Sequence, residues 1–280
     1  MDAAEYRRAS RDVWTAMAPG WDRRSAYFEQ IARPVTERML ERLAPRAGDT
    51  ILDLAAGSGA VGLAAAALAG RGGGRVIVSD FSEAMVEAAQ RNATRIGLAN
   101  VECRVLDAER IALADDEVDG VLCRRGYMLM ADPAAALAET RRVLRPGGRL
   151  ACAVFSGPEE NPWASLPARI LVELGHMPPP ERGGPGILAL ADPDRVRGLL
   201  AGAGFSEPQF DPVPLTWRFA DAGDYWGYLT EVAGAIALVL ARLDDADRAR
   251  VRALLAERAA PFAGDDGLAL PGVSLVVSSS

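Results

Sequence analysis

Residues 51–63 read ILDLAAGSGAVGL, a short apolar run followed directly by a glycine-rich turn. Gly57, Gly59 and Gly62 have the GxGxxG spacing, and the residues after them predict a helix. Glycines at such a turn let the backbone approach a ligand at the helix N-terminus. Asp80 ends the next β-like run, where an acid can accept hydrogen bonds from ribose hydroxyls. The pattern predicts a nucleotide-type cofactor, and taken alone it fits nicotinamide enzymes and adenosyl-cofactor enzymes equally well.

Two more acids separate these two classes of enzyme. Asp53 lies inside the first β-like run, where an anion opposes a pyrophosphate but suits an ammonium group. Asp107 ends the third β-like run and is placed to accept a hydrogen bond from an adenine amine. Both acids favour an adenosyl cofactor with an amino-acid tail. A nicotinamide-dependent oxidoreductase stays an alternative, although no Tyr-x-x-x-Lys relay is present.

Outward from the glycine turn, short β-like runs alternate with helical runs. This alternation predicts an α/β fold with a doubly wound, mostly parallel sheet and helices on both faces. The β-like runs are ILDLA, RVIVSD, VECRVLD, VDGVLC and RLACAVF, with helices expected over 61–68, 82–96 and 133–144. We expect the Pro-Gly-Gly residues 146–148 to form the turn into the fifth strand.

The flanking segments predict a cap over the sheet. Helices are expected over 2–18, ending at Pro19-Gly20, and over 25–43. Residues 157–187 are rich in Pro and Gly and predict a long irregular excursion. A helix starting at Asp192, a β-like segment over 205–219, helices over 222–243 and 245–259 and a last strand over 273–277 follow. We expect one domain over 1–280, with a helical lid (1–45), a cofactor-binding core (46–156), the excursion (157–187) and a helical cap insertion (213–270).

The composition excludes several kinds of chemistry. The chain has 280 residues and a formal charge of −7, and all of its basic side chains are Arg. Without Lys it can form neither a Schiff base nor the lysine grip of a P-loop. One His and three separate Cys do not give the ligand spacing of a zinc or iron centre, so we expect no metal. The acidic pI, near 5.0, counts against nucleic acid as a partner.

The sequence also predicts a cytoplasmic protein. Its first residues contain no apolar stretch typical of a secretory signal. The longest apolar run, residues 232–241, is shorter than the ~20 residues of a membrane helix. Cys103, Cys123 and Cys152 each lie in a β-like run and are expected as unpaired core residues. A homodimer is left open.

Taken together, these motifs resemble those of the class I S-adenosylmethionine-dependent methyltransferases. ILDLAAGSGAVGL resembles the first motif of that family, VIVSDFSEAMVEAA its ribose motif, and LRPGG the turn before its fifth strand. The resemblance is strong over residues 14–155 and is greatest to ubiquinone/menaquinone-biosynthesis C-methyltransferases and small-molecule natural-product enzymes. Ala55 stands where many members have a glycine. The resemblance implies S-adenosylmethionine as cofactor and a Rossmann-like methyltransferase fold with a cap.

The resemblance also implies roles for individual residues. Asp53 should orient the cofactor's amino group, Asp80 should accept the ribose hydroxyls, and Asp107 should read the adenine edge. The full set of expected cofactor contacts is Asp53, Ala55, Gly57, Ser58, Gly59, Asp80, Phe81, Met85, Asp107, Ala108, Glu109 and Arg124. An Asp at a strand end is often only a helix cap or a turn former, and Arg124 and Arg125 can form a solvated charge pair.

Methyl transfer from a sulfonium is an in-line displacement that needs no metal and no covalent nucleophile. We expect C- or O-methylation of a small, largely apolar acceptor under the cap; a cyclase or binding protein that keeps the fold is the other alternative. His176 and Tyr127 are the candidate catalytic bases, with Asp22 and Glu29 as further candidates. The expected acceptor contacts, against ordinary core packing, are Trp14, Trp21, Tyr27, Tyr127, Trp163 and Trp226. Neither the acceptor nor the methylated atom follows from the sequence.

Overall fold

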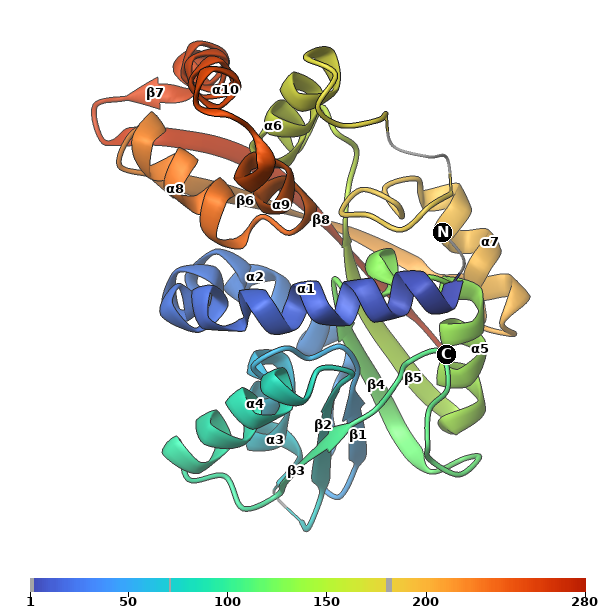
Figure 1. Cartoon of the computed structure of the whole chain (residues 1–280). Coiled ribbons are helices and arrows are strands. Elements are labelled where there is room, and N and C mark those ends of the chain that lie inside the picture. The colour runs from blue at the N-terminus through green and yellow to red at the C-terminus, as the bar shows by residue number, and fades with distance from the viewer. Residues whose placement is uncertain (1–2, 71, 180–182) are drawn as a thin grey trace.

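The computed structural model describes residues 3–70, 72–179 and 183–280 and confirms the doubly wound sheet (Figure 1). The strand order is β3-β2-β1-β4-β5-β8-β6, and the short β7 pairs with β8. Strands β1 to β5 are parallel, whereas β8 is antiparallel to both β5 and β6. The strands are β1 (Thr50–Asp53), β2 (Arg75–Asp80), β3 (Val101–Val105), β4 (Val118–Arg124), β5 (Leu144–Phe155), β6 (Gln209–Phe219), β7 (Ala263–Gly264) and β8 (Gly267–Ser279).

The burial of each strand follows from its place in the sheet. The central strands β2 and β4 are nearly continuous runs of buried residues, as expected for parallel strands covered on both faces. The edge strand β6 instead alternates, with Trp217 and Phe219 buried and Pro212 and Pro214 outside the core. Proline is tolerated there because an edge strand has one unpaired side.

Helices cover both faces of the sheet (Figure 1). Helices α3 and α4 pack on β1 to β3, α2 packs across β4, β5, β8 and β6, and α5 packs with α7 beside β5. The helices are α1 (Ala3–Arg23), α2 (Ser25–Leu43), α3 (Ala60–Ala69), α4 (Glu83–Arg95), α5 (Pro133–Val143), α6 (Pro162–Glu173), α7 (Pro193–Gly202), α8 (Ala222–Val232), α9 (Ala235–Arg242) and α10 (Asp245–Ala259), with 3₁₀ turns η1 (Tyr127–Leu129) and η2 (Ala260–Phe262). The strand order reverses between β1 and β4, so their carboxyl ends form the crevice where open α/β sheets bind ligands.

The first helix does not end at Pro19-Gly20, so that prediction was wrong. Helix α1 continues to Arg23 with Pro19 inside it. A Cβ on Gly20 would lie 3.1 Å from the Glu231 carbonyl oxygen, which shows how closely α1 packs on α8. Packing against α8 therefore outweighs the helix-breaking tendency of the Pro-Gly pair.

Other boundaries also differ from the predictions. The excursion predicted as irregular contains helix α6. Pro162 is compatible with this helix because it lies in the first turn, where its missing N–H costs nothing. The helix predicted over 222–243 is two helices, α8 and α9, separated at Gly234 with φ +56°. The predicted Pro-Gly-Gly turn lies inside β5 as an irregularity in its register with β4. Within the described ranges, no helix has the length and apolar character needed to cross a bilayer.

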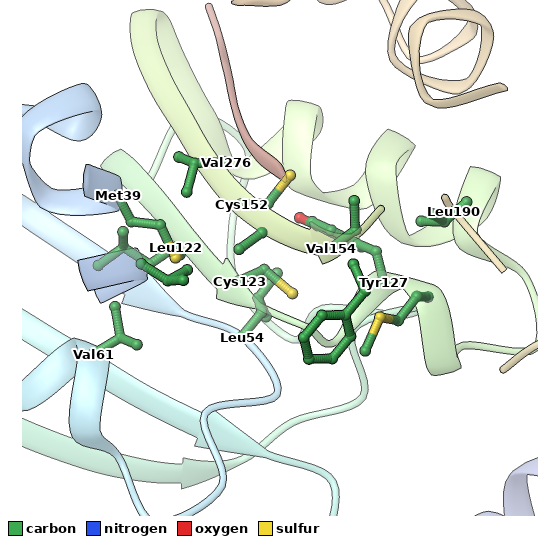
Figure 2. Close-up of a cluster of buried hydrophobic side chains, with 14 of the residues drawn as sticks. Met39, Leu54, Val61, Leu122, Cys123, Tyr127, Cys152, Val154, Leu190 and Val276 are labelled. Carbon is green, nitrogen blue, oxygen red and sulfur yellow. The ribbon is translucent and has the colours of Figure 1, made fainter. Parts of the chain in front are cut away.

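The core beneath the crevice between β1 and β4 is apolar and closely packed (Figure 2). It joins Met39 of α2 to Leu122 of β4 and Val276 of β8, all buried. Cys123 and Cys152 face each other in the register of β4 and β5 as buried, free thiols, whereas Cys103 is only partly buried. The core prediction therefore holds for two of the three cysteines.

Candidate active site

The glycine loop between β1 and α3 has the left-handed backbone that its sequence predicts. Ala55, Gly57 and Gly59 have φ angles of +51°, +56° and +87°. Glycine adopts this conformation without a steric penalty, whereas Ala55 does so at a cost. A Cβ on Gly57 would meet no atom within 4 Å, so the loop leaves space beside that residue. The Ser58 carbonyl accepts a hydrogen bond from the Asn92 amide at 3.1 Å, which ties the loop to α4.

Asp53, at the end of β1, is a fully buried acid with an unused oxygen. Its Oδ2 accepts the Gly62 amide at 2.7 Å, whereas Oδ1 is buried without a hydrogen-bond partner among the described residues. Burial raises the pKa of Asp53 to about 7, although the Gly62 amide and Arg124 act to lower it. A buried acceptor of this kind suits a cationic donor. The observation fits the amino group of an S-adenosylmethionine tail.

Asp80, at the end of β2, binds the glycine loop directly. Oδ2 accepts the Gly57 amide at 2.9 Å, and Oδ1 accepts the Ser82 amide at 3.0 Å. Burial raises the pKa of Asp80, while the amides of Ser82, Gly57 and Phe81 lower it. An ionised carboxylate has about four acceptor positions, so the two hydrogen bonds from Gly57 and Ser82 leave capacity for ribose hydroxyls. The structure therefore brings Asp53, Asp80 and Gly57 together, as predicted.

The residues expected around the adenine lie on the neighbouring loops and at the start of α4. Met85 and Ala108 are buried, and Phe81 is partly buried beneath the Arg11 guanidinium at 5.7 Å. Asp107 is partly buried and accepts the Glu109 amide at 2.9 Å, which leaves its second oxygen for another donor.

Glu109 is occupied by protein groups. Its Oε1 accepts the amides of Ala131 and Asp132 at 2.8 and 3.1 Å, and its Oε2 pairs with Arg7 of α1. The structure gives this residue a role in joining α1 to the loop before α5, and it gives no support to the predicted cofactor contact.

Helix α1 lies across these loops (Figure 1). The Thr15 and Ser82 hydroxyls are 3.4 Å apart, and the Tyr6 hydroxyl donates to the Leu129 carbonyl at 3.1 Å. At the other end of α1, Arg23 Nη2 donates a hydrogen bond to Glu231 of α8 at 2.6 Å. Helix α1 thus connects the cofactor loops to the cap.

Arg124, another expected cofactor contact, faces α2 instead. Its Nη2 donates to Glu29 at 2.8 Å and its Nη1 to Thr36 at 2.7 Å. The same ion pair occupies Glu29, one of the candidate bases. The side chain of Asp22, another candidate base, lies outside the described residues.

The two predicted catalytic bases are not at the site. His176 lies between α6 and α10, with Nε2 3.6 Å from Asp247 Oδ2. The Tyr127 hydroxyl lies 2.7 Å from the Thr140 hydroxyl, which itself donates to the Ala136 carbonyl. Tyr127 is enclosed in the apolar core (Figure 2), and burial raises its pKa well above the usual value. We therefore interpret Tyr127 as a core residue. Its burial counts against both predicted roles, as a catalytic base and as an acceptor contact.

Three of the six aromatic residues predicted to contact the acceptor, Trp21, Tyr27 and Trp163, lie in one cluster under the cap. Trp21 stacks on Phe28 with ring centroids 3.9 Å apart, and Trp163 stacks on Trp217 at the same distance. Tyr27 lies within 6.3 Å of the Trp217 ring and donates to the Arg218 carbonyl. Burial raises the pKa of Tyr27.

Two predicted aromatics lie at or beyond the margin of this cluster. Trp14 reaches it only through Trp21, at 5.7 Å, and Trp226 instead lies under the Arg248 guanidinium. The prediction omitted five further members of the cluster: Phe28, Phe155, Trp217, Phe219 and Tyr228. The density of aromatic residues over 217–228 was the available signal for Tyr228.

The contact between Gly62 and Asp53 leads to a stability prediction. A Cβ on Gly62 would lie 2.7 Å from Val78 Cγ2 and 2.8 Å from Asp53 Oδ2. We expect Gly62→Ala to lower the free energy of unfolding by about 1–3 kcal/mol, as overpacking of a core does. The matched control is Gly198→Ala in α7, where a Cβ meets nothing within 4 Å and helix propensity should raise stability by about 0.5–1 kcal/mol. Urea unfolding measures both, and a gain of stability at Gly62 contradicts the prediction.

Comparison with known proteins places this site in a family. A family model described as a methyltransferase domain matches residues 52–152. A ubiquinone/menaquinone biosynthesis C-methyltransferase, UbiE of Klebsiella pneumoniae, is 30% identical over 59% of this chain and 69% of its own length. Nocamycin O-methyltransferase of Saccharothrix syringae is 34% identical over 64% of this chain and 66% of its own length. The chain spans about half the length of other curated relatives, from 40% to 61%.

Solved structures with the same fold include enzymes of more than one kind. A putative methyltransferase from Bacillus halodurans superposes with a TM-score of 0.61 and 19% identity, over 87% of this chain and 97% of that one. A cyclase, SpnF, superposes with a TM-score of 0.55 and 20% identity, over 90% of this chain and 82% of that one. Similarity at this level shows the fold alone. From the sequence relatives, the chain belongs to the class I S-adenosylmethionine-dependent methyltransferases and is related to the ubiquinone/menaquinone-biosynthesis C-methyltransferases.

Proposed function

We propose that this protein binds S-adenosylmethionine and transfers its methyl group to carbon or oxygen of a small, largely apolar acceptor. The observation that carries the proposal is the pair of buried carboxylates, Asp53 and Asp80, at the carboxyl ends of β1 and β2 beside the left-handed glycine loop. Relatives named as a quinone C-methyltransferase and an antibiotic O-methyltransferase support a small-molecule acceptor.

The chain's own residues would bind and orient the two reactants. Asp53 Oδ1, which has no hydrogen-bond partner in the described part of the chain, would accept a hydrogen bond from an ammonium group, and Asp80 would accept from ribose hydroxyls. When bound, the cofactor supplies an electrophilic methyl group on a sulfonium. In this proposal a flat acceptor packs against Trp21 and Tyr27, the partly buried rings of the aromatic cluster, and the cluster excludes water. Neither His176 nor Tyr127 is placed to act as a base, so catalysis by positioning is the mechanism that this arrangement supports.

Two measurements test the proposal. Calorimetric titration should give saturable binding of S-adenosylmethionine and none of NAD, because Asp53 opposes a pyrophosphate. Incubation with methyl-labelled S-adenosylmethionine and fractionated metabolites should transfer label to a small molecule, identified by mass spectrometry. Absence of cofactor binding rejects the proposal. Cofactor binding without label transfer across a broad acceptor screen favours a non-methylating role such as that of a cyclase.

The proposal includes the cytoplasm as the place of action. The free thiols of Cys103, Cys123 and Cys152 are consistent with a reducing compartment.

A further inference from the structure

Arg125 is a cation at the edge of the site with unused hydrogen-bond donors. It directly follows β4 and has φ +66°, a left-handed conformation that is uncommon for a residue other than glycine. Its amide donates to the Ala153 carbonyl at 2.8 Å, and a Cβ on the next residue, Gly126, would lie 2.6 Å from the Ala55 Cβ. The close packing of this turn on the glycine loop holds Arg125 in its strained conformation, and strain of this kind clusters at functional sites.

The unused donors form one edge of the guanidinium group. Part of the residue reaches the surface, but Nε and Nη2 are both buried and have no hydrogen-bond partner among the described residues. The N–H bonds of Nε and Nη2 on this edge are parallel and match the two oxygens of a carboxylate. The guanidinium lies over the Phe155 ring, 4.3 Å from its centroid, so its face is already occupied and its edge is left for a ligand.

The acid whose charge acts on Arg125 does not satisfy this edge. That acid, Glu29, pairs instead with Arg124 at 2.8 and 3.3 Å. Burial and the adjacent Arg124 cation lower the pKa of Arg125 to about 9, as expected for a charge without an anion of its own. A buried cation that lacks a partner is costly, and bringing an anion to it removes that cost.

Arg125 also lies between the two halves of the site. Its Phe155 neighbour contacts Trp163 of the aromatic cluster, with ring centroids 5.1 Å apart. Its charge acts on the buried Tyr228 hydroxyl of α8, where it opposes the rise in pKa that burial causes. On the other side, the Gly126 turn touches Ala55 of the cofactor loop. A ligand on Arg125 would therefore adjoin both the cofactor loop and the aromatic surface.

We propose that Arg125 binds a carboxylate on the methyl acceptor, so that the acceptor is an aromatic or apolar acid. This inference rests on the proposed function and specifies the substrate class of the same site. Arg125 is then an acceptor-binding residue that holds the molecule by its charged end, while the aromatic cluster packs against its body.

The test uses matched pairs of probes on the intact chain. Benzoic, cinnamic and 2-naphthoic acids and their primary amides are titrated by calorimetry into protein saturated with S-adenosylhomocysteine. We expect at least one acid to bind about 10- to 150-fold more tightly than its amide, and Arg125→Met to abolish that preference. Arg125→Lys should restore only part of it, because Lys lacks the two-donor edge. Arg149→Met is the control, since Arg149 also has a buried Nε without a partner among the described residues but pairs with Gly120 in the first half of β4, away from the carboxyl end where Arg125 follows.

The outcomes separate this inference from the proposed function. If S-adenosylmethionine itself does not bind the wild-type protein, the proposed function fails. If the cofactor binds equally to wild type and Arg125→Met but no acid is preferred to its amide, only the carboxylate inference is overturned. Urea unfolding adds an independent readout, because Arg125→Met should leave the ligand-free protein at least as stable as wild type. A loss of stability in that variant, with the acid preference unchanged, assigns Arg125 to the fold and overturns the inference.

Discussion

Asp80→Ala is expected to weaken the binding of S-adenosylmethionine by about 10- to 150-fold, the cost of losing a hydrogen bond to a charged group. Asp80 is buried at the end of β2, and its two oxygens hold the amides of Gly57 and Ser82. Its removal takes away both the ribose acceptor and the bond that holds the glycine loop. Calorimetric titration of the purified variant measures the effect.

Two controls separate loss of the ligand contact from loss of the loop. Asp192→Ala removes an Asp that caps α7 by accepting the Asp194 amide, far in sequence from the cofactor loops. Its cofactor affinity should equal that of wild type. Asp80→Asn keeps a neutral acceptor and should lie between wild type and Asp80→Ala. Equal affinity in all four proteins contradicts the assignment of Asp80 to the ribose.

The sequence predicts which acids lie beside the glycine turn because these signals are local. A glycine turn and the acids at strand ends occupy fixed places in a parallel sheet, so the pattern of residues alone is enough to group Asp53, Asp80 and Gly57. Boundaries set by distant packing are not predictable in this way. The Pro19-Gly20 pair signals a break, yet contact with α8 continues the helix through it.

The direction in which a side chain points is the second feature that the sequence could not predict. Tyr127 follows β4 at the expected edge, but its hydroxyl pairs with Thr140, thirteen residues later, and points into the core. Arg124 and Arg125 are adjacent in sequence and differ in surroundings: Arg124 has Glu29 and Thr36, whereas Nε and Nη2 of Arg125 have no partner among the described residues. Which arginine meets a ligand depends on α2, about ninety-five residues away in the chain, and no local pattern carries that information.

Asp53 should make the ligand-free protein less stable as the pH rises. The carboxyl has a pKa of 3.8 when unfolded and about 7 in the folded protein, so the folded state holds its proton more tightly. The stabilisation is fully present below pH 3.8 and is lost as the pH rises through about 7. The loss for a shift of this size is on the order of 4 kcal/mol. We expect Asp53→Asn to remove this dependence, as measured by urea unfolding at pH 5 and pH 8.

A second acid provides a control of opposite sign. Although burial raises the pKa of Asp119, the Thr50 amide and Arg145 outweigh it and hold that pKa below the usual value. Asp119 therefore contributes stability that is present above pH 3.8 and lost as the pH falls through its lowered pKa. Asp119→Asn should reduce stability at pH 8, where Asp53→Asn should increase it. A common sign for the two variants at pH 8 contradicts this account of Asp53.

The same measurement, repeated with the cofactor, links the stability lost on ionising Asp53 to its proposed contact with the amino group. An ammonium group on Oδ1 favours the ionised carboxylate, so saturating S-adenosylmethionine should reduce the loss of stability between pH 5 and pH 8 in wild type. Asp53→Asn has no charge for the ammonium to meet, so its pH dependence should be the same with and without the cofactor. If the cofactor stabilises both proteins equally at both pH values, Asp53 does not contact the amino group. The destabilising carboxylate would then be a feature of the β1–α3 turn rather than of ligand binding.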